Sequence, residues 1–365
     1  MRVWLPTTVY QQATKRLEYI LREFESVTVC TSGGKDSTVL LELTLQVARK
    51  MGKLPVHLFF IDQEAEWQAT IDYIEETMTR DEVVPHWLQM PIQLANASNA
   101  DDPWLWCWKE GHNWMRKKHQ LAETENRYNT TRFHKIFKAW ARGNYDGPHA
   151  YLAGVRASES MSRCRAFHTA QSTYKHINWG KKLDQKRQHF TFYPLYDWTT
   201  TDIWHAIETH GWKYCKVYDW MHQHGMARER MRVSNLHHET ALPLLEVLQE
   251  LEPETWEKLT SRLQGISSCG QLADDFFMPK VLPTMFADWA EYRDHLLANL
   301  VPEMHRDKMQ AEFAKQVATF QPEVHTKLHK HQCKAILSND YEQVLFDYFR
   351  ANYWSKTNDK AKQAT

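Results

Sequence analysis

The chain has 365 residues, enough for two domains of ordinary size, and 42% of them are hydrophobic, which excludes a wholly disordered protein. Lysine plus arginine and aspartate plus glutamate both number 45, so net charge gives no global reason to expect nucleic acid or membrane binding. The six cysteines are scattered without any CxxC pair, which disfavours a disulfide framework or a structural zinc site.

The same features predict where the protein resides. Scattered cysteines fit a reducing compartment. No long apolar region follows the first residues, so a signal peptide is not expected. The most apolar run, 54–61, is far shorter than the roughly 20 residues of a membrane helix. We therefore expect a cytoplasmic protein without a membrane-spanning segment.

The first part of the chain alternates between helix and strand patterns. Apolar residues recur at helical spacing in two stretches, and β-branched or apolar runs follow them. The predicted elements are a helix ending near residue 24, a strand over 27–31, a helix from 36 to a stop at Gly52, a strand over 56–62, a helix over 67–79 and a strand over 83–88. Strand, helix and strand at this spacing predict an α/β fold with a parallel sheet.

The rest of the chain reads less evenly. Residues 96–148 give little periodicity apart from an aromatic cluster over 102–108. We then expect a strand over 150–156, a long active-site loop over 158–188, a strand over 190–196 and a helix over 202–210 capped by Thr200 or Thr201. The pattern becomes helical over 242–251, 253–263, 286–300 and 306–320, with a frayed tail from 355. Domains over 1–235 and 236–365 are therefore expected.

A phosphate-binding turn is predicted directly after the first strand, formed by Ser32, Gly33, Gly34, Lys35, Asp36 and Ser37. Two consecutive glycines allow a tight turn that points N–H groups into one concavity, and the following helix adds unpaired N–H groups and its dipole. The serine hydroxyls can donate hydrogen bonds, and the lysine can neutralise phosphate charge. Val29 stands where the Walker A pattern needs glycine, so this is a different kind of turn. The alternative is a plain glycine turn with a solvated lysine.

Three further segments accompany the turn: an acidic strand end over 60–64, a Gly-x-Arg-x-x-Glu-Ser-x-x-Arg motif over 154–163 and a Pro-Leu-x-x-Trp-Thr-x-x-Asp-Ile-Trp segment over 194–204. Together they resemble the PP-loop ATP pyrophosphatase superfamily, and most closely its branch of phosphoadenosine phosphosulfate (PAPS) reductases and the small subunit of bacterial ATP sulfurylase. The resemblance implies an adenine nucleotide alpha-hydrolase-like (PP-loop, HUP-type) domain. It also implies that ATP, or a PAPS-like adenine nucleotide, binds with magnesium.

A narrower resemblance involves segments 62–65, 102–104, 216–219 and 231–232. They are similar to the subgroup of PAPS-reductase-like proteins that carries an additional DUF3440 region, which the helical residues 236–365 would form. Members of this subgroup often occur beside a ParB-like protein. The resemblance therefore implies a ParB-like partner.

The second motif supplies candidate ligands for the nucleotide. Gly154 after a strand lets the backbone approach a ligand closely. Arg156 and Arg163 are suited to phosphate or sulfate oxygens, because guanidinium groups bind such oxygens in pairs. Glu159 can hold one of these guanidinium groups or help to coordinate magnesium. The alternative for the arginines is an ordinary surface ion-pair cluster.

Two carboxylates are candidate magnesium ligands. Asp62 follows a strand at its carboxyl end, where ligands sit in open parallel sheets, and is placed to bind magnesium or the ribose. Its alternative role is to cap the next helix. Asp36 is a helix cap, a metal ligand or both, and Glu64 and Glu66 are weaker candidates. The segment over 193–204 is interpreted as structural.

The positions of the cysteines indicate whether a member of this branch can reduce a sulfonucleotide. Thiol-dependent reductases that the chain resembles carry a nucleophilic cysteine in a Glu-Cys-Gly segment near the carboxyl terminus. The last cysteine here, Cys333, lies in His-Gln-Cys-Lys, and Cys269 before a glycine is the nearest substitute. No paired cysteines for an iron–sulfur cluster are present. PAPS reduction is therefore disfavoured.

Two further patterns have weaker functional interpretations. His325, His329 and Cys333 recur four residues apart and span about 12 Å along a helix, too far for one metal ion, so a solvated or partner-facing stripe is expected. Basic residues recur over 181–187 and 228–232. They are interpreted as nucleotide phosphate contacts or a solvated loop rather than a nucleic acid site.

The leading hypothesis is an enzyme that binds ATP and magnesium, transfers the adenylyl group to an unknown acceptor and releases pyrophosphate, in connection with sulfur chemistry. Lys35 and Arg156 would stabilise the charge on the leaving pyrophosphate. The alternatives are a nucleotide-sensing regulator that acts with a ParB-like partner, and a PAPS reductase-type enzyme.

Overall fold

The structure is a computed structural model that describes residues 6–95, 104–168, 173–229, 231–233, 235–238, 241, 244–263, 265–266, 281–343, 346 and 349–350. The chain divides into two compact units. The first comprises Met1–Gln93, Trp106–Asn235 and Val247–Thr255, and the second comprises Leu94–Leu105, Leu236–Glu246 and Trp256–Thr365. No helix among the described residues is long and apolar enough to cross a membrane.

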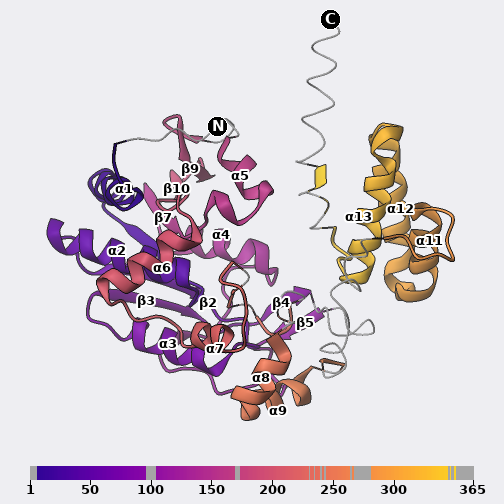
Figure 1. Ribbon diagram of the computed structural model, residues 1–365, viewed down its shortest axis with the longest axis horizontal. Coiled ribbons are helices and arrows are strands. Elements are labelled where there is room, and N and C mark those ends of the chain that lie inside the picture. The colour runs from indigo at the N-terminus through magenta and orange to yellow at the C-terminus, as the bar shows by residue number, and fades with distance from the viewer. Residues whose placement is uncertain are drawn as a thin grey trace, which may run out of the picture. The chain divides into compact units, whose positions relative to one another are not determined.

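An eight-stranded sheet forms the centre of the first unit (Figure 1). Its spatial order is β6 (Ala122–Glu123), β3 (Val83–Leu88), β2 (Val56–Ile61), β1 (Val27–Cys30), β7 (His149–Ala153), β10 (His189–Phe192), β9 (Ile177–Asp184) and β8 (Thr173–Tyr174). The strands from β6 to β10 pair in parallel, and β9 and β8 are antiparallel. A separate two-stranded sheet pairs β4 (Ile92–Ala95) with β5 (Trp104–Cys107). The predicted parallel sheet is confirmed for its six parallel strands.

Helices cover both faces of the large sheet. α1 (Val9–Glu23), α2 (Lys35–Met51), α3 (Gln68–Met78) and α6 (Thr200–His210) share one hydrophobic core with it, to which β1 contributes Val27 and Val29. On the other face lies α4 (Phe133–Asn144), whose buried Trp140 contacts Phe59 of β2 with ring centroids 4.2 Å apart. Burial on both faces explains the continuous apolar character of these strands.

Two local predictions are wrong. The long loop expected over 158–188 contains the short helix η1 (Ala157–Glu159), α5 (Met161–His168), β8 and β9. β9 lies next to the edge strand β8 and carries the exposed Lys182, and polar residues of this kind near a sheet edge hid its strand character. The cap of α6 is Thr199 rather than Thr200 or Thr201. Its hydroxyl accepts from the Asp202 N–H at 3.2 Å, and the Asp202 carboxylate accepts from the Thr199 N–H at 2.7 Å.

The remaining helices are α7 (Val217–Gln223), α8 (Leu245–Leu251), α9 (Pro253–Arg262), α11 (Trp289–Leu300), α12 (Glu303–Thr319) and α13 (Pro322–Leu337). In the second unit α11, α12 and α13 enclose a core that includes Leu296, Phe313 and Ile336.

The predicted solvated or partner-facing stripe on α13 is wrong. Cys333 is fully buried and donates to the Trp289 carbonyl at 3.6 Å, and His329 hydrogen bonds with Arg293 of α11 at 2.7 Å. The tail from 355 and Cys269 lie outside the described residues.

Four histidines gather on the sheet face that α4 covers. His57 and His86 hydrogen bond ring to ring at 2.9 Å, His149 hydrogen bonds with the Thr28 hydroxyl at 2.8 Å, and the His189 ring lies 6.0 Å from that of His149. Burial lowers the pKa of all four, to about 4 for His86 and about 3 for His149. They are therefore neutral in the folded protein at neutral pH.

This cluster predicts acid sensitivity. A histidine whose folded pKa lies below its unfolded value of about 6.5 loses its contribution to stability as pH falls below that value. We expect the free energy of unfolding, measured with urea, to decrease by about 2 kcal/mol for each of His86 and His149 between about pH 7 and pH 5. His149→Gln, which retains a hydrogen-bonding side chain but cannot be protonated, should show a smaller decrease. A constant free energy over this range would contradict the assignment.

Candidate functional site

The strand order reverses at β1. From β1 the chain passes to β2 and β3 on one side, and later segments place β7 and β10 on the other. In open α/β sheets, ligands bind outside the carboxyl ends of the strands at such a switch point. The predicted phosphate turn follows β1, and Arg156 follows β7, so the topology brings these two motifs to the same edge of the sheet.

Steric constraints explain why both Gly33 and Gly34 of the turn are glycines. Gly33 has a φ of 71°, which favours glycine, and a Cβ there would lie 2.7 Å from Cγ2 of Thr70 in α3. A Cβ on Gly34 would lie 3.3 Å from the Tyr218 hydroxyl. α2 starts at the next residue with Gly34 as its cap, and Gly34 provides no side chain to cap the first N–H groups.

The first N–H groups of α2 are the main feature of the site. The Lys35 N–H donates to the Tyr218 hydroxyl at 3.0 Å. The N–H groups of Gly34, Asp36 and Ser37 have no hydrogen-bond partner within the part of the chain that the structure describes. Unpaired N–H groups at a helix start, together with the helix dipole, favour an anion such as phosphate.

The hydroxyl groups of the turn have separate tasks. Ser37 Oγ donates to the Gly34 carbonyl at 2.8 Å and accepts from the Ser32 N–H at 3.3 Å. Thr31 Oγ1 accepts from the Gly33 N–H at 3.2 Å. These bonds fix the shape of the turn, so the Ser37 hydroxyl is engaged internally. Ser32 is exposed, and its side chain is free to meet a ligand.

Three charged side chains surround the helix start. Lys35 Nζ lies 3.3 Å from the Asp36 carboxylate, and Arg156 pairs with the other Asp36 oxygen. Both cations are only 4% exposed. Burial lowers the pKa of Lys35, and the Asp36 charge opposes this shift. The lysine ammonium also donates to the Met231 carbonyl at 3.1 Å. Two cations therefore sit beside the free N–H groups with a single carboxylate between them.

The second motif holds Arg156 in place. Arg156 donates to the Ser158 hydroxyl at 2.9 Å, and its Nε lies 3.7 Å from Glu159. Glu159 also pairs with Arg163, whose side chain is 46% exposed. The structure thus brings Arg156 to the turn, whereas Arg163 pairs with Glu159.

Gly154 lies close to the backbone of α2, so its close approach is to protein rather than to a ligand. A Cβ at this position would lie 2.9 Å from the Asp36 carbonyl oxygen and 3.1 Å from the Ser37 nitrogen. Real Cβ atoms do not approach backbone so closely, so only glycine lets β7 pack against the first turn of α2. Gly154 thereby fixes the distance between the two motifs.

Asp62 occupies a fully buried position at the end of β2. Its carboxylate accepts from Trp87 Nε1 at 3.0 Å, Gln89 Nε2 at 2.8 Å and the Glu64 N–H at 2.9 Å, and it pairs with Arg116. Four donors occupy both oxygens. Asp36 belongs to the cluster at the turn, and the structure shows no contact between the two carboxylates. No group of three or more histidine, cysteine, aspartate or glutamate side chains among the described residues is arranged to hold a metal ion.

Glu64 and Glu66 are buried in the same region. Glu64 has a φ of 66° and accepts from the Trp108 N–H at 2.9 Å. Glu66 hydrogen bonds with Asn235, and burial followed by repulsion from Asp62 raises its pKa to about 8. Glu66 is therefore protonated at neutral pH.

Sequence reasoning missed several residues at the turn and beside it. Tyr218 accepts from the backbone of Lys35, and its ring centroid lies 5.3 Å from the lysine ammonium. Met231 supplies a carbonyl to the same ammonium, and Arg116 neutralises Asp62. Tyr218 and Met231 lie in the two segments that the narrower resemblance singled out, which was the available signal. Arg116 lies where the sequence has no clear periodicity.

The basic residues are distributed over different elements. Lys181 and Lys182 lie on β9, and Arg187 in the following turn pairs with Asp146. Arg232 lies close enough to Lys35 to lower the pKa of that ammonium. Within the described residues, Arg232 is thus the member of this set whose charge acts on the turn.

Comparison with known families agrees with this topology. Residues 26–223 match the family model for the phosphoadenosine phosphosulfate reductase domain. The chain belongs to this family. Residues 225–355 match the model of DUF3440, a domain of unknown function. The predicted membership of the PP-loop superfamily, the PAPS reductase-like branch and the DUF3440 subgroup is confirmed, as is the α/β PP-loop fold with a helical C-terminal region.

Relatives differ in how much of the chain they share. The Escherichia coli (strain K12) protein YbdN is 27% identical over 400 residues, covering 99% of this chain and 96% of YbdN. Sulfate adenylyltransferase subunit 2 of Mycobacterium tuberculosis is 25% identical over 208 residues, covering 54% of this chain and 59% of that subunit. The chain thus spans less than two thirds of the sulfate adenylyltransferase subunits that it matches.

Similar solved structures include Candida glabrata FMN adenylyltransferase in complex with FMN and an ATP analogue, with a TM-score of 0.36, 15% identity and coverage of 60% of this chain and 64% of the other. The PAPS reductase of Candida auris, in a phosphate complex, has a TM-score of 0.32, 15% identity and coverage of 60% and 94%. TM-scores this low support no closer assignment. The fold class is therefore based on the sheet order and the family match.

Asp62 stabilises the fold through its protein partners. Asp62→Asn leaves Arg116 buried without its counter-charge, so we expect the free energy of unfolding to fall by about 3 kcal/mol. Urea unfolding in EDTA measures this loss in the absence of metal. A loss that appears only with magnesium would contradict this expectation and indicate a metal-binding role for Asp62.

Proposed function

We propose that this protein binds ATP at the phosphate turn and transfers its adenylyl group to an acceptor, releasing pyrophosphate. The observation that carries the proposal is the set of three unpartnered N–H groups at the start of α2, flanked by the buried cations Lys35 and Arg156. The similarity to sulfate adenylyltransferase subunit 2 supports adenylyl transfer and a link to sulfur chemistry. We also propose a cytoplasmic location, with nucleotide-binding residues 1–235 and a helical region over 236–365.

The proposed step breaks the bond between the α-phosphorus and its bridging oxygen. An acceptor oxygen forms a new bond to the α-phosphorus, and pyrophosphate leaves with the electron pair. The free N–H groups bind phosphate oxygens, and Lys35 turns from the Met231 carbonyl towards the growing negative charge. Arg156, held by Asp36 and Ser158, stays fixed as a second positive charge. Fixed donors cost no reorganisation when charge develops.

Magnesium is proposed only as part of the MgATP substrate. A resident magnesium site needs available carboxylate oxygens. Asp62 has four donors on its carboxylate, and each Asp36 oxygen faces a cation, so neither carboxylate fits such a site in this arrangement.

Sulfonucleotide reduction has less support. A nucleophilic cysteine needs a lowered pKa, because the thiolate is the reactive form. Burial instead raises the pKa of Cys30, beside the turn, and of Cys333, in the second unit, to about 12. Both thiols are thus protonated and poorly reactive.

The reaction is tested by measuring pyrophosphate release from MgATP with candidate acceptor oxyanions, beginning with sulfate. Lys35→Met should lower the rate by about 100-fold or more, because it removes one charge that stabilises the transition state. Lys50→Met provides the matched control, since Lys50 is exposed at the far end of the same helix and should leave the rate unchanged.

A nucleotide-sensing regulator is the second candidate, and the chain after α7 favours it. Two residues of this segment contact the site: the Met231 carbonyl accepts from Lys35, and Asn235 hydrogen bonds with Glu66. The segment leads directly into the helical region. A phosphate that takes Lys35 would release Met231 and alter this connection, and a ParB-like protein is the proposed partner. Tight ATP binding with no pyrophosphate release for any acceptor would favour sensing over catalysis.

A further inference from the structure

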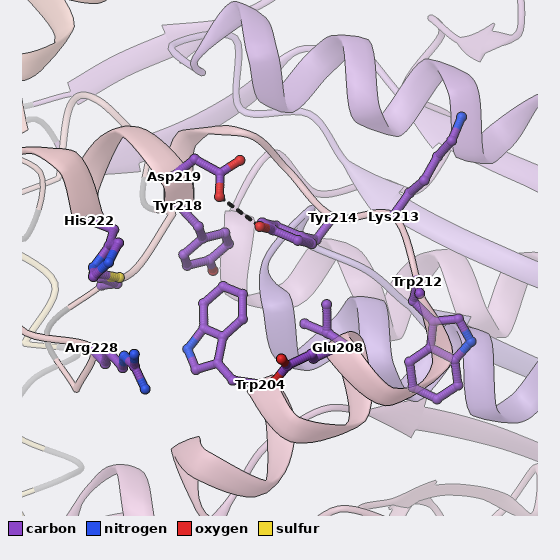
Figure 2. Close-up of a pocket in the computed structure, with 12 residues that line it drawn as sticks. Trp204, Glu208, Trp212, Lys213, Tyr214, Tyr218, Asp219, His222 and Arg228 are labelled. Atoms are coloured by element: carbon purple, nitrogen blue, oxygen red, sulfur yellow. Dashed lines mark hydrogen bonds between the residues drawn. The ribbon is translucent and has the colours of Figure 1, made fainter.

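A cavity of about 550 Å³ in the first unit lies beside α6 and α7 (Figure 2). Its volume falls in the range of small-molecule sites, which is about 300–1,000 Å³. Trp204 and Glu208 of α6, Tyr218 and His222 of α7, and Arg228 are among the residues that line it. The phosphate turn does not line this cavity, so the two sites are distinct.

The centre of the cavity is aromatic. Trp204 meets Tyr214 and Tyr218 edge to face, with ring centroids 5.3 Å apart in both pairs. Trp204 is half-buried, and Figure 2 shows its indole between Tyr218 and Arg228. Such a surface binds planar rings, and stacking of a base on an aromatic side chain is worth about 1–3 kcal/mol.

One end of the cavity offers donors. Arg228 and His222 are exposed, and the structure gives neither side chain a hydrogen bond or ion pair. The buried indole N–H of Trp204 has no hydrogen-bond partner among the described residues, and Figure 2 shows it pointing to the side where Arg228 lies. A buried donor without an acceptor is rare in native proteins. An anionic group placed here would satisfy both the indole and the guanidinium.

The remaining lining charges differ in their availability. The Asp219 carboxylate accepts from the Tyr214 hydroxyl at 2.6 Å, and Lys213 pairs with Glu76 and points away from the cavity in Figure 2. The structure gives the exposed Glu208 carboxylate no partner. A free acceptor is therefore available on a different part of the wall from the Arg228 donors.

We propose that this cavity binds a nucleoside monophosphate whose base carries an amino group. The base stacks on Trp204, the phosphate binds Arg228 and the Trp204 N–H, and the amino group donates to Glu208. Tyr218 and Met231 line this cavity and also contact Lys35, so the cavity adjoins the phosphate turn without including it. The site accepts a second ligand whether or not the turn catalyses adenylyl transfer.

Cytidine and uridine monophosphate provide the test, because they differ in one amino or carbonyl group and neither is an adenine nucleotide. Calorimetry on the full chain should give binding about 10-fold tighter for cytidine monophosphate, since a carboxylate accepts from the cytosine amino group. Arg228→Ala should weaken both ligands by about 10-fold, because a charge-assisted bond to phosphate is lost. Glu208→Gln should remove the preference between them.

Two controls separate this cavity from other sites. Lys216→Ala changes an exposed residue directly before α7 that does not line the cavity, and should leave both affinities unchanged. Lys35→Met should also leave cytidine monophosphate binding intact. No binding at millimolar ligand, equal affinities for the two nucleotides, or loss of binding in Lys35→Met would each overturn the proposal. Unchanged urea unfolding midpoints for the Arg228 and Glu208 variants show that an affinity loss is not a folding defect.

Discussion

The start of α2 is the constraint on which the rest of the site depends. The N–H groups of Gly34, Asp36 and Ser37 are unpaired among the described residues because Gly34 provides no capping side chain, and they lie at the sheet edge where the strand order reverses. Gly154 sets the distance from β7 to this helix start, and Asp36 ties Arg156 to it. Asp36 and Glu159 hold the buried cations Lys35 and Arg156 beside the unpaired N–H groups, so the helix start is electrostatically prepared for phosphate.

Local sequence features predicted the elements that local chemistry determines. The β-branched run before Ser32, the two glycines and the apolar spacing after them indicated a strand, a turn and a helix, and β1 and α2 confirm this order. The acidic end of β2 and the position of Gly154 after β7 were also evident from the sequence. Parallel pairing followed because strand, helix and strand in succession have one favoured handedness.

Contacts between distant segments were beyond such reasoning. Asp62 looked like a ligand because it ends a strand, but Arg116 and Trp87 approach it from later segments and occupy its oxygens. Tyr218 reaches Lys35 across 183 positions of sequence. β9 lacked a clear signal because a strand next to the sheet edge needs few apolar residues, and Cys333 looked exposed because its partner helix α11 is remote in sequence. The sequence-based view therefore identified the motifs but not their protein partners.

The most direct test of the account is a glycine amide spectrum. The chain has 12 glycines, so selective ¹⁵N-glycine labelling gives a sparse two-dimensional NMR spectrum in which Gly34 can be assigned by substitution. Titration with MgATP should move the Gly34 amide downfield, because its free N–H gains a phosphate acceptor, while Gly52 at the far end of α2 stays in place. ATP binding that leaves Gly34 unchanged would contradict the assignment of the turn as the phosphate site.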